Sequence, residues 1–244
     1  MISVEVSVIV PTINYGRFIK RAIESIYSQN FPKEKIEVIV IGGKSSDNTL
    51  DILKEYENKN NFYVYTQEKK GISNAVNIGI KKSKGKYILR LDADDAFYQN
   101  IIYKEYKILE KNLNVDFAYP DYNYYLLEEE KWVRKYLPKF SKDELIRRGD
   151  FLSGGTMFRK NIFEKYGGYD ETIPTLDCYE LILRLMKNNV MGYHISEPLF
   201  EYTIHGSSLS DDTSLIEKTQ NEIAKKYNIK FQKNINHPRN IYSK

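Results

Sequence analysis

The chain has 244 residues, of which 41% are hydrophobic and 29% are charged, and its formal net charge is +4. This composition predicts a folded, soluble protein with a substantial core, and the mild basic excess selects neither a nucleic acid nor a membrane as partner. A single cysteine, Cys178, excludes an internal disulfide framework, and no apolar run approaches the roughly 20 residues that span a bilayer.

The first part of the chain predicts a β-α-β unit. Runs rich in Val and Ile at residues 4–11 and 35–43 end in turn residues, as strands buried on both faces do. Between them, apolar residues recur at helical spacing from Phe18 to Ile26. The first run lacks a basic n-region and a cleavage site, so we interpret it as a strand and expect a cytoplasmic location.

The same alternation continues along the chain. It predicts a helix that opens near Ser46 or Asp47, a strand at 62–66, a helix at 73–83 and a strand at 87–91. Right-handed crossovers between these elements build a doubly wound sheet, whose ligand crevice lies at the carboxyl ends of the strands.

Three carboxylates stand where the last of these strands ends. Asp92, Asp94 and Asp95 lie within four residues, and their mutual repulsion beside a buried strand is costly. A bound Mg²⁺ or Mn²⁺ removes that cost, because both ions favour oxygen ligands and bind through one or two carboxylates plus substrate phosphates. The alternative is a solvated acidic turn that caps the next helix.

The second half of the chain has a different pattern. It predicts a helix at 98–112, a Tyr-rich hairpin within 115–140, a short helix capped by Ser141, a strand at 154–159 and a helix at 177–189. The chain shows no internal repeat and no clear linker. We therefore expect one domain over residues 1–212, with a nucleotide-binding half at 1–97 and an acceptor half at 98–212.

A C-terminal appendage is expected at residues 213–244. One amphipathic stretch, with Ile216 and Ile223 on its apolar side, precedes a polar tail that includes Lys233 and Arg239. This helix either packs its apolar stripe back onto the domain or rests on the inner face of an anionic membrane as a peripheral contact. The oligomeric state is not predicted.

Several ordered motifs together resemble inverting family 2 glycosyltransferases. Residues 6–49 resemble the opening of that family, and the likeness continues through 71–95, 154–171, 179–185 and 204–210. The resemblance implies the α/β GT-A fold, a Rossmann-like doubly wound mixed sheet flanked by helices. It also implies transfer of a sugar from a nucleotide-diphosphate donor to an acceptor hydroxyl, with inversion at the anomeric carbon.

The resemblance assigns roles to the carboxylates. Asp94 matches the principal ligand of Mn²⁺ or Mg²⁺, Asp92 lies near the ribose or the metal, and Asp95 supports them, with Ala93 beside the nucleotide sugar. His205 matches a position that reaches the metal or the diphosphate from the C-terminal side. Its alternative is an ordinary core or surface histidine.

The resemblance also assigns nucleotide contacts, and the chain departs from the family at two of these positions. Pro11, Thr12 and Asn14 match the first nucleotide-binding turn, although plain turn chemistry would use the same residues. Gly42 stands where the family has an aspartate that reads the base, and Val76 replaces an arginine beside Asn77. We assign Gly42 and Asn77 to the nucleotide sugar. These departures weaken the expectation of UDP; Lys44 or Lys69 is a candidate substitute cation.

The family's catalytic aspartate is also displaced. Cys178 occupies its place, two residues before Glu180, and Asp177 lies one residue earlier. An inverting displacement needs a carboxylate that takes the proton of the acceptor hydroxyl, and a thiol with a pKa near ~8.5 is a poor substitute. We therefore assign Asp177 as the base, with a helix N-cap as its alternative role.

Acceptor binding is assigned to the second half of the chain. The hairpin from Tyr119 to Tyr136 offers aromatic faces, among them Trp132, that stack on sugars, and ordinary packing is the alternative. Gly154 and Gly155 are assigned to the acceptor as well. The acceptor class expected is a glycan or a lipid-linked glycan in polysaccharide or glycoprotein synthesis.

Three other hypotheses about the function compete with that of an active transferase. The first is a non-catalytic sugar-nucleotide-binding module that has lost its base. A nucleotidyltransferase lacks support because no Gly-rich phosphate loop follows the first strand. Nucleic-acid binding is not expected, because the tyrosines cluster in an acidic hairpin and not on a basic face.

Overall fold

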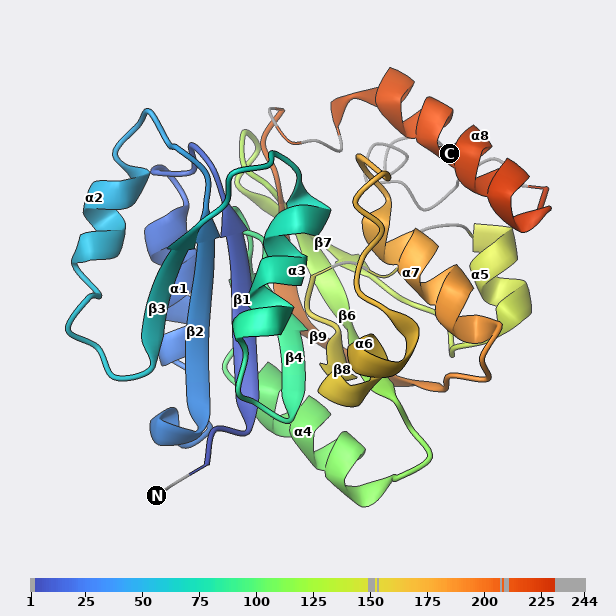
Figure 1. The fold of residues 1–244 in the computed structure, drawn as a ribbon, viewed down its shortest axis with the longest axis horizontal. Helices are drawn as coiled ribbons and strands as arrows, with labels where there is room; N and C mark the ends of the chain where they lie inside the picture. Colours follow the sequence, from blue (N-terminus) through green and yellow to red (C-terminus); the bar gives the residue numbers. More distant parts are fainter. Residues whose placement is uncertain (1–2, 149–151, 153, 207, 209–210, 231–244) are drawn as a thin grey trace.

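The computed structural model describes residues 3–148, 152, 154–206, 208 and 211–230 (Figure 1). Within these residues, one mixed sheet has the strand order β3-β2-β1-β4-β8-β6-β9-β5, and β7 pairs with β6. Its strands are β1 Val6–Thr12, β2 Ile36–Gly42, β3 Phe62–Thr66, β4 Tyr87–Arg90, β5 Ala96–Phe97, β6 Phe117–Leu126, β7 Lys131–Lys135, β8 Met157–Arg159 and β9 Gly192–Ile204.

Helices cover both faces of this sheet, with α3 in front of β1 and β4 in Figure 1 and α1 behind. The helices in the described residues are α1 Ile19–Tyr27, α2 Thr49–Lys54, α3 Ile72–Lys82, α4 Ile101–Lys111, α5 Lys142–Arg148, α6 Lys160–Tyr166, α7 Asp177–Met186 and α8 Thr213–Tyr227, with a 3-10 turn at Lys33–Lys35.

The first half of the chain forms the parallel sheet that the sequence predicts. β1 pairs in parallel with β2 and β4, and β2 pairs in parallel with β3, so the carboxyl ends of four strands share one edge. Every residue of β1 and β2 is buried, and the apolar side of α1 is buried as well. The doubly wound topology is therefore confirmed.

The predicted hairpin and capped helix are also confirmed. β6 and β7 pair antiparallel around the acidic turn that follows Leu126. At the start of α5, the backbone N–H of Glu144 donates to Oγ of Ser141 over 3.1 Å.

Three elements have no counterpart in the sequence analysis: β9, α6 and the two-residue strand β5. β9 is the longest strand, and it pairs in parallel with β6 through register shifts beside Pro120 and Asp121. Pro198 of β9 lies opposite Asp121, and a proline within a sheet is tolerated at such an irregularity. This proline and the bulge conceal the strand pattern from sequence reading.

The helix α8 packs back onto the protein. Ile216 and Ile223 are buried, with Thr219 between them. The packed alternative therefore describes this helix, whereas the basic tail with Lys233 and Arg239 lies outside the described residues. No helix in the described part of the chain is long and apolar enough to cross a membrane.

Candidate active site

A cleft of about 1770 Å³ opens at the carboxyl edge of the parallel strands. It lies where the topology predicts a ligand crevice, beyond the ends of β1, β2, β3 and β4. The lining residues fall mainly within 11–18, 43–47, 66–75, 90–95, 171–178 and 202–216. The first four stretches belong to the nucleotide-binding half expected from the sequence, and the last two come from the second half.

A buried arginine joins two of the predicted site carboxylates. Nε and Nη2 of Arg90 donate to the two carboxylate oxygens of Asp92 over 2.7 and 3.1 Å, and Nη1 donates to Oδ2 of Asp177 over 2.7 Å. Burial acts to lower the pKa of Arg90, but Asp177 and Asp92 outweigh it and raise that pKa above its usual value. Arg90 thus carries a permanent positive charge between Asp92 and Asp177.

Asp94 has a different partner. Its Oδ2 lies 3.0 Å from Nε2 of His205, and the hydroxyl of Ser208 lies 3.1 Å from the same nitrogen. The ring of Phe18 stacks on His205 with the ring centres 4.7 Å apart. The structure thus brings Asp94 and His205 together, as the sequence predicts, and Ala93 lines the cleft beside them.

Asp95 faces the scaffold. Its Oδ1 accepts a hydrogen bond from the backbone N–H of Thr203 over 2.9 Å, and Oδ2 has no partner among the described residues. Burial, followed by the charges of Asp94 and Asp92, raises the pKa of this carboxyl well above its usual range. Asp95 therefore supports the cluster as a buried acid.

The start of α7 places Asp177 and Cys178 at the cleft wall. Both side chains are buried and line the cleft, and Asp177 is the first helical residue. The N-cap is Leu176, whose φ of 57° is left-handed, so the N-cap alternative for Asp177 is wrong. A leucine in this conformation costs about 1–2 kcal/mol, which the surrounding loop must offset.

The first predicted turn lies at the end of β1. Pro11, Thr12 and Asn14 all line the cleft, and Oγ1 of Thr12 is buried without a partner among the described residues. Asn14 has a left-handed φ of 58° and fastens this turn to the one after β2. Its backbone N–H donates to Oγ of Ser45 over 3.0 Å, and its Oδ1 accepts from the N–H of Ser46 over 2.7 Å.

Two residues that we assigned to the nucleotide sugar lie outside the cleft lining. Gly42 ends β2, and the lining passes instead through Gly43. Asn77 uses its side chain on a distant loop: Nδ2 donates to the carbonyl of Tyr169 over 2.9 Å and to Glu171 over 3.1 Å, and Oδ1 accepts from the N–H of Tyr169 over 2.8 Å. Asn77 therefore holds the loop that precedes α7.

The two candidate substitute cations differ in whether they line the cleft. Lys44 lines the cleft, whereas Lys69 forms an ion pair with Glu171 at 2.8 Å and lies outside the lining. Besides Arg90, two further cations that the sequence analysis did not single out, Arg17 and Lys70, also line the cleft.

The residues assigned to the acceptor are dispersed. Gly154 lines the cleft, while Gly155, with a left-handed φ of 74°, lies too close to Phe200 for a larger side chain. Trp132 lies on β7, outside the cleft lining. The residue is 54% exposed, and its Nε1 donates to Glu201 over 2.6 Å. Of the predicted aromatic platform, Tyr122 lines the cleft.

Asp94 and His205 supply the donor atoms that a divalent cation needs. A carboxylate oxygen and an imidazole nitrogen suit Mn²⁺, and both side chains line the cleft. Both oxygens of Asp92 already accept from Arg90, and this neighbouring positive charge makes Asp92 a weaker ligand than Asp94. Within the described residues, no three His, Cys, Asp or Glu side chains gather as a metal site. The chain thus offers two ligands, and substrate phosphates must complete the set.

Sequence reading missed Arg90 and the loop that precedes α7. An arginine inside a buried parallel strand is a signal, because such a charge needs a counter-ion. Its partner Asp177 is 87 residues away, however, so the pairing itself has no local signature.

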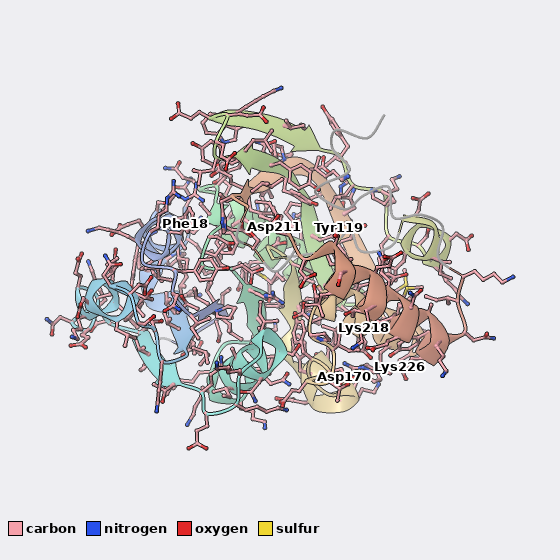
Figure 2. All side chains as sticks on the ribbon, turned by 90° about the horizontal axis from the view of Figure 1, so that it is seen from above. Phe18, Tyr119, Asp170, Asp211, Lys218 and Lys226 are labelled. Carbon is pink, nitrogen blue, oxygen red and sulfur yellow. The ribbon has the colours of Figure 1, made fainter. Side chains whose placement is uncertain are left out.

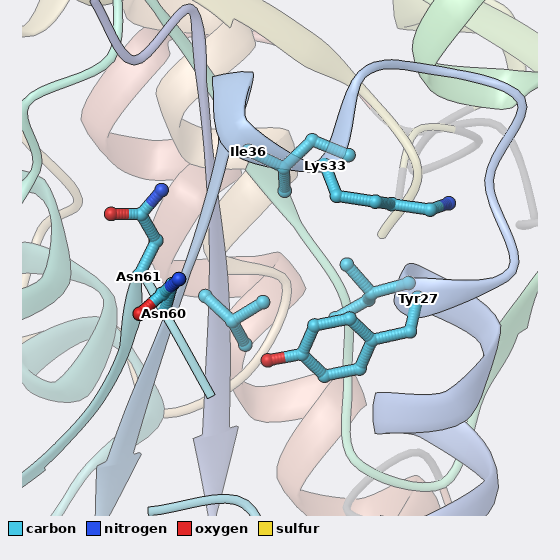
Figure 3. A pocket seen from close by; sticks show the side chains of 7 residues that line it. Tyr27, Lys33, Ile36, Asn60 and Asn61 are labelled. Carbon is cyan, nitrogen blue, oxygen red and sulfur yellow. The ribbon is translucent and has the colours of Figure 1, made fainter. Parts of the chain in front are cut away.

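A second hollow, at the opposite ends of the strands, is too small to be a ligand site. It lies among Tyr27, Lys33, Ile36 and Asn61 (Figure 3) and measures about 10 Å³. That volume holds at most about one water molecule.

Comparisons with known proteins agree on one family. The family model described as Glycosyl transferase family 2 matches residues 7–167. A dolichyl N-acetyl-alpha-D-glucosaminyl phosphate 3-beta-D-2,3-diacetamido-2,3-dideoxy-beta-D-glucuronosyltransferase of Methanococcus voltae is 39% identical over 87 residues. That match covers 34% of this chain and only 27% of the relative's length.

Two solved structures share the fold. S. aureus TarS 1–349 in complex with UDP-GlcNAc has a TM-score of 0.72 and 20% identity, over 93% of this chain and 68% of that one. The mannosyltransferase PcManGT of Pyrobaculum calidifontis, in complex with GDP-Man and Mn²⁺, has a TM-score of 0.71 and 17% identity, over 98% of this chain and 68% of that one.

Proposed function

Since the chain belongs to glycosyl transferase family 2 and has the GT-A fold, we propose that it transfers a sugar from a nucleoside-diphosphate sugar to an acceptor hydroxyl. One observation carries the proposal. The family's carboxylate cluster stands at the mouth of a large cleft, at the strand edge where nucleotides bind in doubly wound sheets. The structures of TarS with UDP-GlcNAc and of PcManGT with GDP-Man support this class of donor.

The nucleotide occupies the turns after β1, β2 and β3 in this proposal. Several hydrogen bonds hold the first two turns together, among them the two described for Asn14 and one from the N–H of Gly16 to Asp47 over 2.9 Å. A turn fixed in this way needs little reordering when the donor binds, which favours affinity. The cations Arg17, Lys44 and Lys70 on the cleft wall suit a diphosphate.

In this proposal Asp94 and His205 would hold a divalent cation, as the Mn²⁺ in PcManGT suggests. The cation, when bound, supplies positive charge to the departing nucleoside diphosphate. Arg21 holds the backbone at Asp94 in place, because its Nη2 donates to the carbonyl of that residue over 2.6 Å.

Asp177 acts as the base and the sugar inverts at its anomeric carbon. Arg90 binds Oδ2 of this carboxylate, and among the described residues Oδ1 has no hydrogen-bond donor. One oxygen is thus fixed, and the other remains for the proton of the acceptor hydroxyl. The thiol of Cys178 is a poor substitute, because an ordinary thiol has a pKa near ~8.5.

The acceptor enters from the side of residues 171–178 and α8. We infer a glycan or lipid-linked acceptor, and the dolichyl phosphate substrate named for the Methanococcus voltae enzyme supports it. Tyr202, which is partly buried and lines the cleft, suits a sugar ring, because aromatic faces pack against the C–H faces of sugars.

Two variants and a nucleotide panel test the proposal. The panel measures the melting temperature with Mn²⁺ and UDP, GDP, UDP-GlcNAc or GDP-Man, and the release of nucleoside diphosphate from each sugar donor. Asp94→Asn should lose the Mn²⁺-dependent stabilisation and the turnover. Asp177→Asn should keep the stabilisation and lose turnover by 100-fold or more, since general bases contribute about 10²–10⁴-fold.

Asp51→Asn, an exposed carboxylate change on α2, serves as the control and should behave like the wild type. Unchanged turnover in EDTA would contradict the metal dependence. Nucleotide-sugar binding without turnover in the wild type would instead support a non-catalytic binding module.

A further inference from the structure

The helix α8 carries a lysine that binds two carboxylates on different elements. Nζ of Lys226 lies 2.7 Å from Oδ2 of Asp170 and 2.8 Å from Oε1 of Glu180. Figure 2 looks down on this side of the molecule and labels Lys226 beside Asp170, with Lys218 about two turns away on the same helix. The contact lies beyond residue 167, where the family match ends.

Glu180 is the buried partner in this contact. The residue is fully buried on α7, one turn after Asp177. Its Oε1 also accepts from the hydroxyl of Tyr227 over 2.5 Å, and Arg184 lies 3.4 Å from both of its oxygens. A buried carboxylate persists only when such partners compensate for its lost hydration.

Asp170 begins the loop that forms the acceptor side of the cleft. Its Oδ1 accepts from the N–H and the hydroxyl of Thr172, over 2.9 and 2.6 Å, which fixes the turn. Although burial acts to raise the pKa of Asp170, its hydrogen bonds with Lys226 and Thr172 lower that pKa to about 2. From here, residues 171–178 line the cleft without interruption.

The same loop is anchored on its other side. Asn77 of α3 binds Tyr169 and Glu171, and Lys69 pairs with Glu171. Only Lys226 connects the loop to α8, among the ion pairs of the described residues. Two residues at the start of α8, Asp212 and Ile216, themselves line the cleft.

We propose that Lys226 is a positioning residue: by bridging Asp170 and Glu180 it fixes the loop 170–176 and the start of α7, so that α8 completes the acceptor side of the cleft. The proposal rests on the proposed function, because it assumes that Asp177 acts on an acceptor. Leu176, whose φ is left-handed, lies within the stretch that the bridge holds, and such a conformation persists only where the surroundings enforce it.

Three variants separate positioning from general stability. Lys226→Met keeps the length of the side chain and removes the charge, Lys226→Arg keeps both carboxylates within reach of a cation, and Lys218→Met is the control. Lys218 is exposed on the same helix and has no ion pair among the described residues.

Hydrogen exchange followed by mass spectrometry is the first readout. In Lys226→Met, amide exchange in residues 168–177 should rise about tenfold or more, as expected for the loss of charged hydrogen bonds, while exchange in β1, β2 and β4 stays unchanged. Lys226→Arg should restore most of the protection, and Lys218→Met should match the wild type. Uniformly faster exchange throughout the sheet, or unchanged exchange in the loop, would overturn the proposal.

The second readout concerns function. UDP affinity in the presence of Mn²⁺, measured by calorimetry, should stay within about twofold in Lys226→Met, while kcat for nucleotide-sugar turnover falls and Lys226→Arg recovers it. A loss of UDP affinity equal to the loss of kcat would contradict a role confined to the acceptor side. If UDP and GDP fail to bind even to the wild type, the proposed function fails, whereas the exchange result still decides whether Lys226 holds the loop.

Discussion

Replacement of Arg90 by methionine should destabilise the protein strongly, because it removes a cation shared by two carboxylates. Arg90 is 9% exposed, and its partners Asp92 and Asp177 have side chains that are 22% and 10% exposed. Methionine has a similar length and no charge, so it fills the space without the three hydrogen bonds that Arg90 donates.

The expected magnitude follows from the burial of the two partners. Breaking a buried ion pair on one side costs about 3–5 kcal/mol, because an unpaired buried charge remains. Asp92 can regain water, so the estimate rests on Asp177 alone and takes the lower end, about 3 kcal/mol. For a chain of this size, about 3 kcal/mol corresponds to a melting temperature lower by about 6–12 °C.

The assay is thermal and urea unfolding of Arg90→Met, of Asp177→Asn and of the double variant. If the cost comes from the stranded carboxylate, the double variant should be more stable than Arg90→Met alone, which is the signature of a coupled pair. Arg17→Met, an exposed arginine on the cleft wall, is the control and should change little. A loss below about 1 kcal/mol in Arg90→Met, or a double variant no better than that single one, would refute the reasoning.

Three further outcomes are expected. Because Gly42 offers no side chain to read the base, UDP should bind no more than modestly better than GDP, CDP or dTDP, and a strong preference for UDP in calorimetry would contradict this. Asn77→Ala should lower turnover and leave UDP affinity unchanged, because the amide of Asn77 holds Tyr169 and Glu171. A selective loss of UDP affinity would instead indicate that Asn77 binds the nucleotide. Burial raises the pKa of Glu105 well above its usual range, so the folded chain keeps a proton that the unfolded chain releases above about pH 4.3. Stability should therefore fall as pH rises from about 4.3 in the wild type and less so in Glu105→Gln; parallel urea midpoints across this range would count against the assignment.

The parts of the fold that the sequence predicts well are those with local causes. The Val and Ile runs of β1 and β2 are buried along their whole length, and the helix between them buries the side that its spacing predicts. The place of the carboxylates at the strand edge follows from these elements alone, because parallel strands bring their carboxyl ends together.

The parts that sequence reading misses depend on distant partners. β9 contains Pro198 and pairs across a bulge, so its strand pattern is interrupted. Asn77 has the residue type expected of a ligand contact, yet its amide binds a loop more than 90 residues away. Side-chain chemistry identifies what such a residue is able to bind, while the partner that it meets depends on the completed fold.

In the carboxylate cluster, the completed fold gives each of the three aspartates a different environment. Each aspartate has its own partner: Asp92 the guanidinium of Arg90, Asp94 the imidazole of His205, and Asp95 a backbone N–H of β9. Arg90 compensates the charge of Asp92, and burial together with the two neighbouring carboxylates raises the pKa of Asp95 well above its usual range, so the protein itself reduces the repulsion in the cluster. Of the three, Asp94 combines a place in the cleft lining with a partner that is itself a metal-binding side chain. That combination makes Asp94 the residue whose replacement should affect donor binding, and it makes Asp92 and Asp95 parts of the frame that holds it in place.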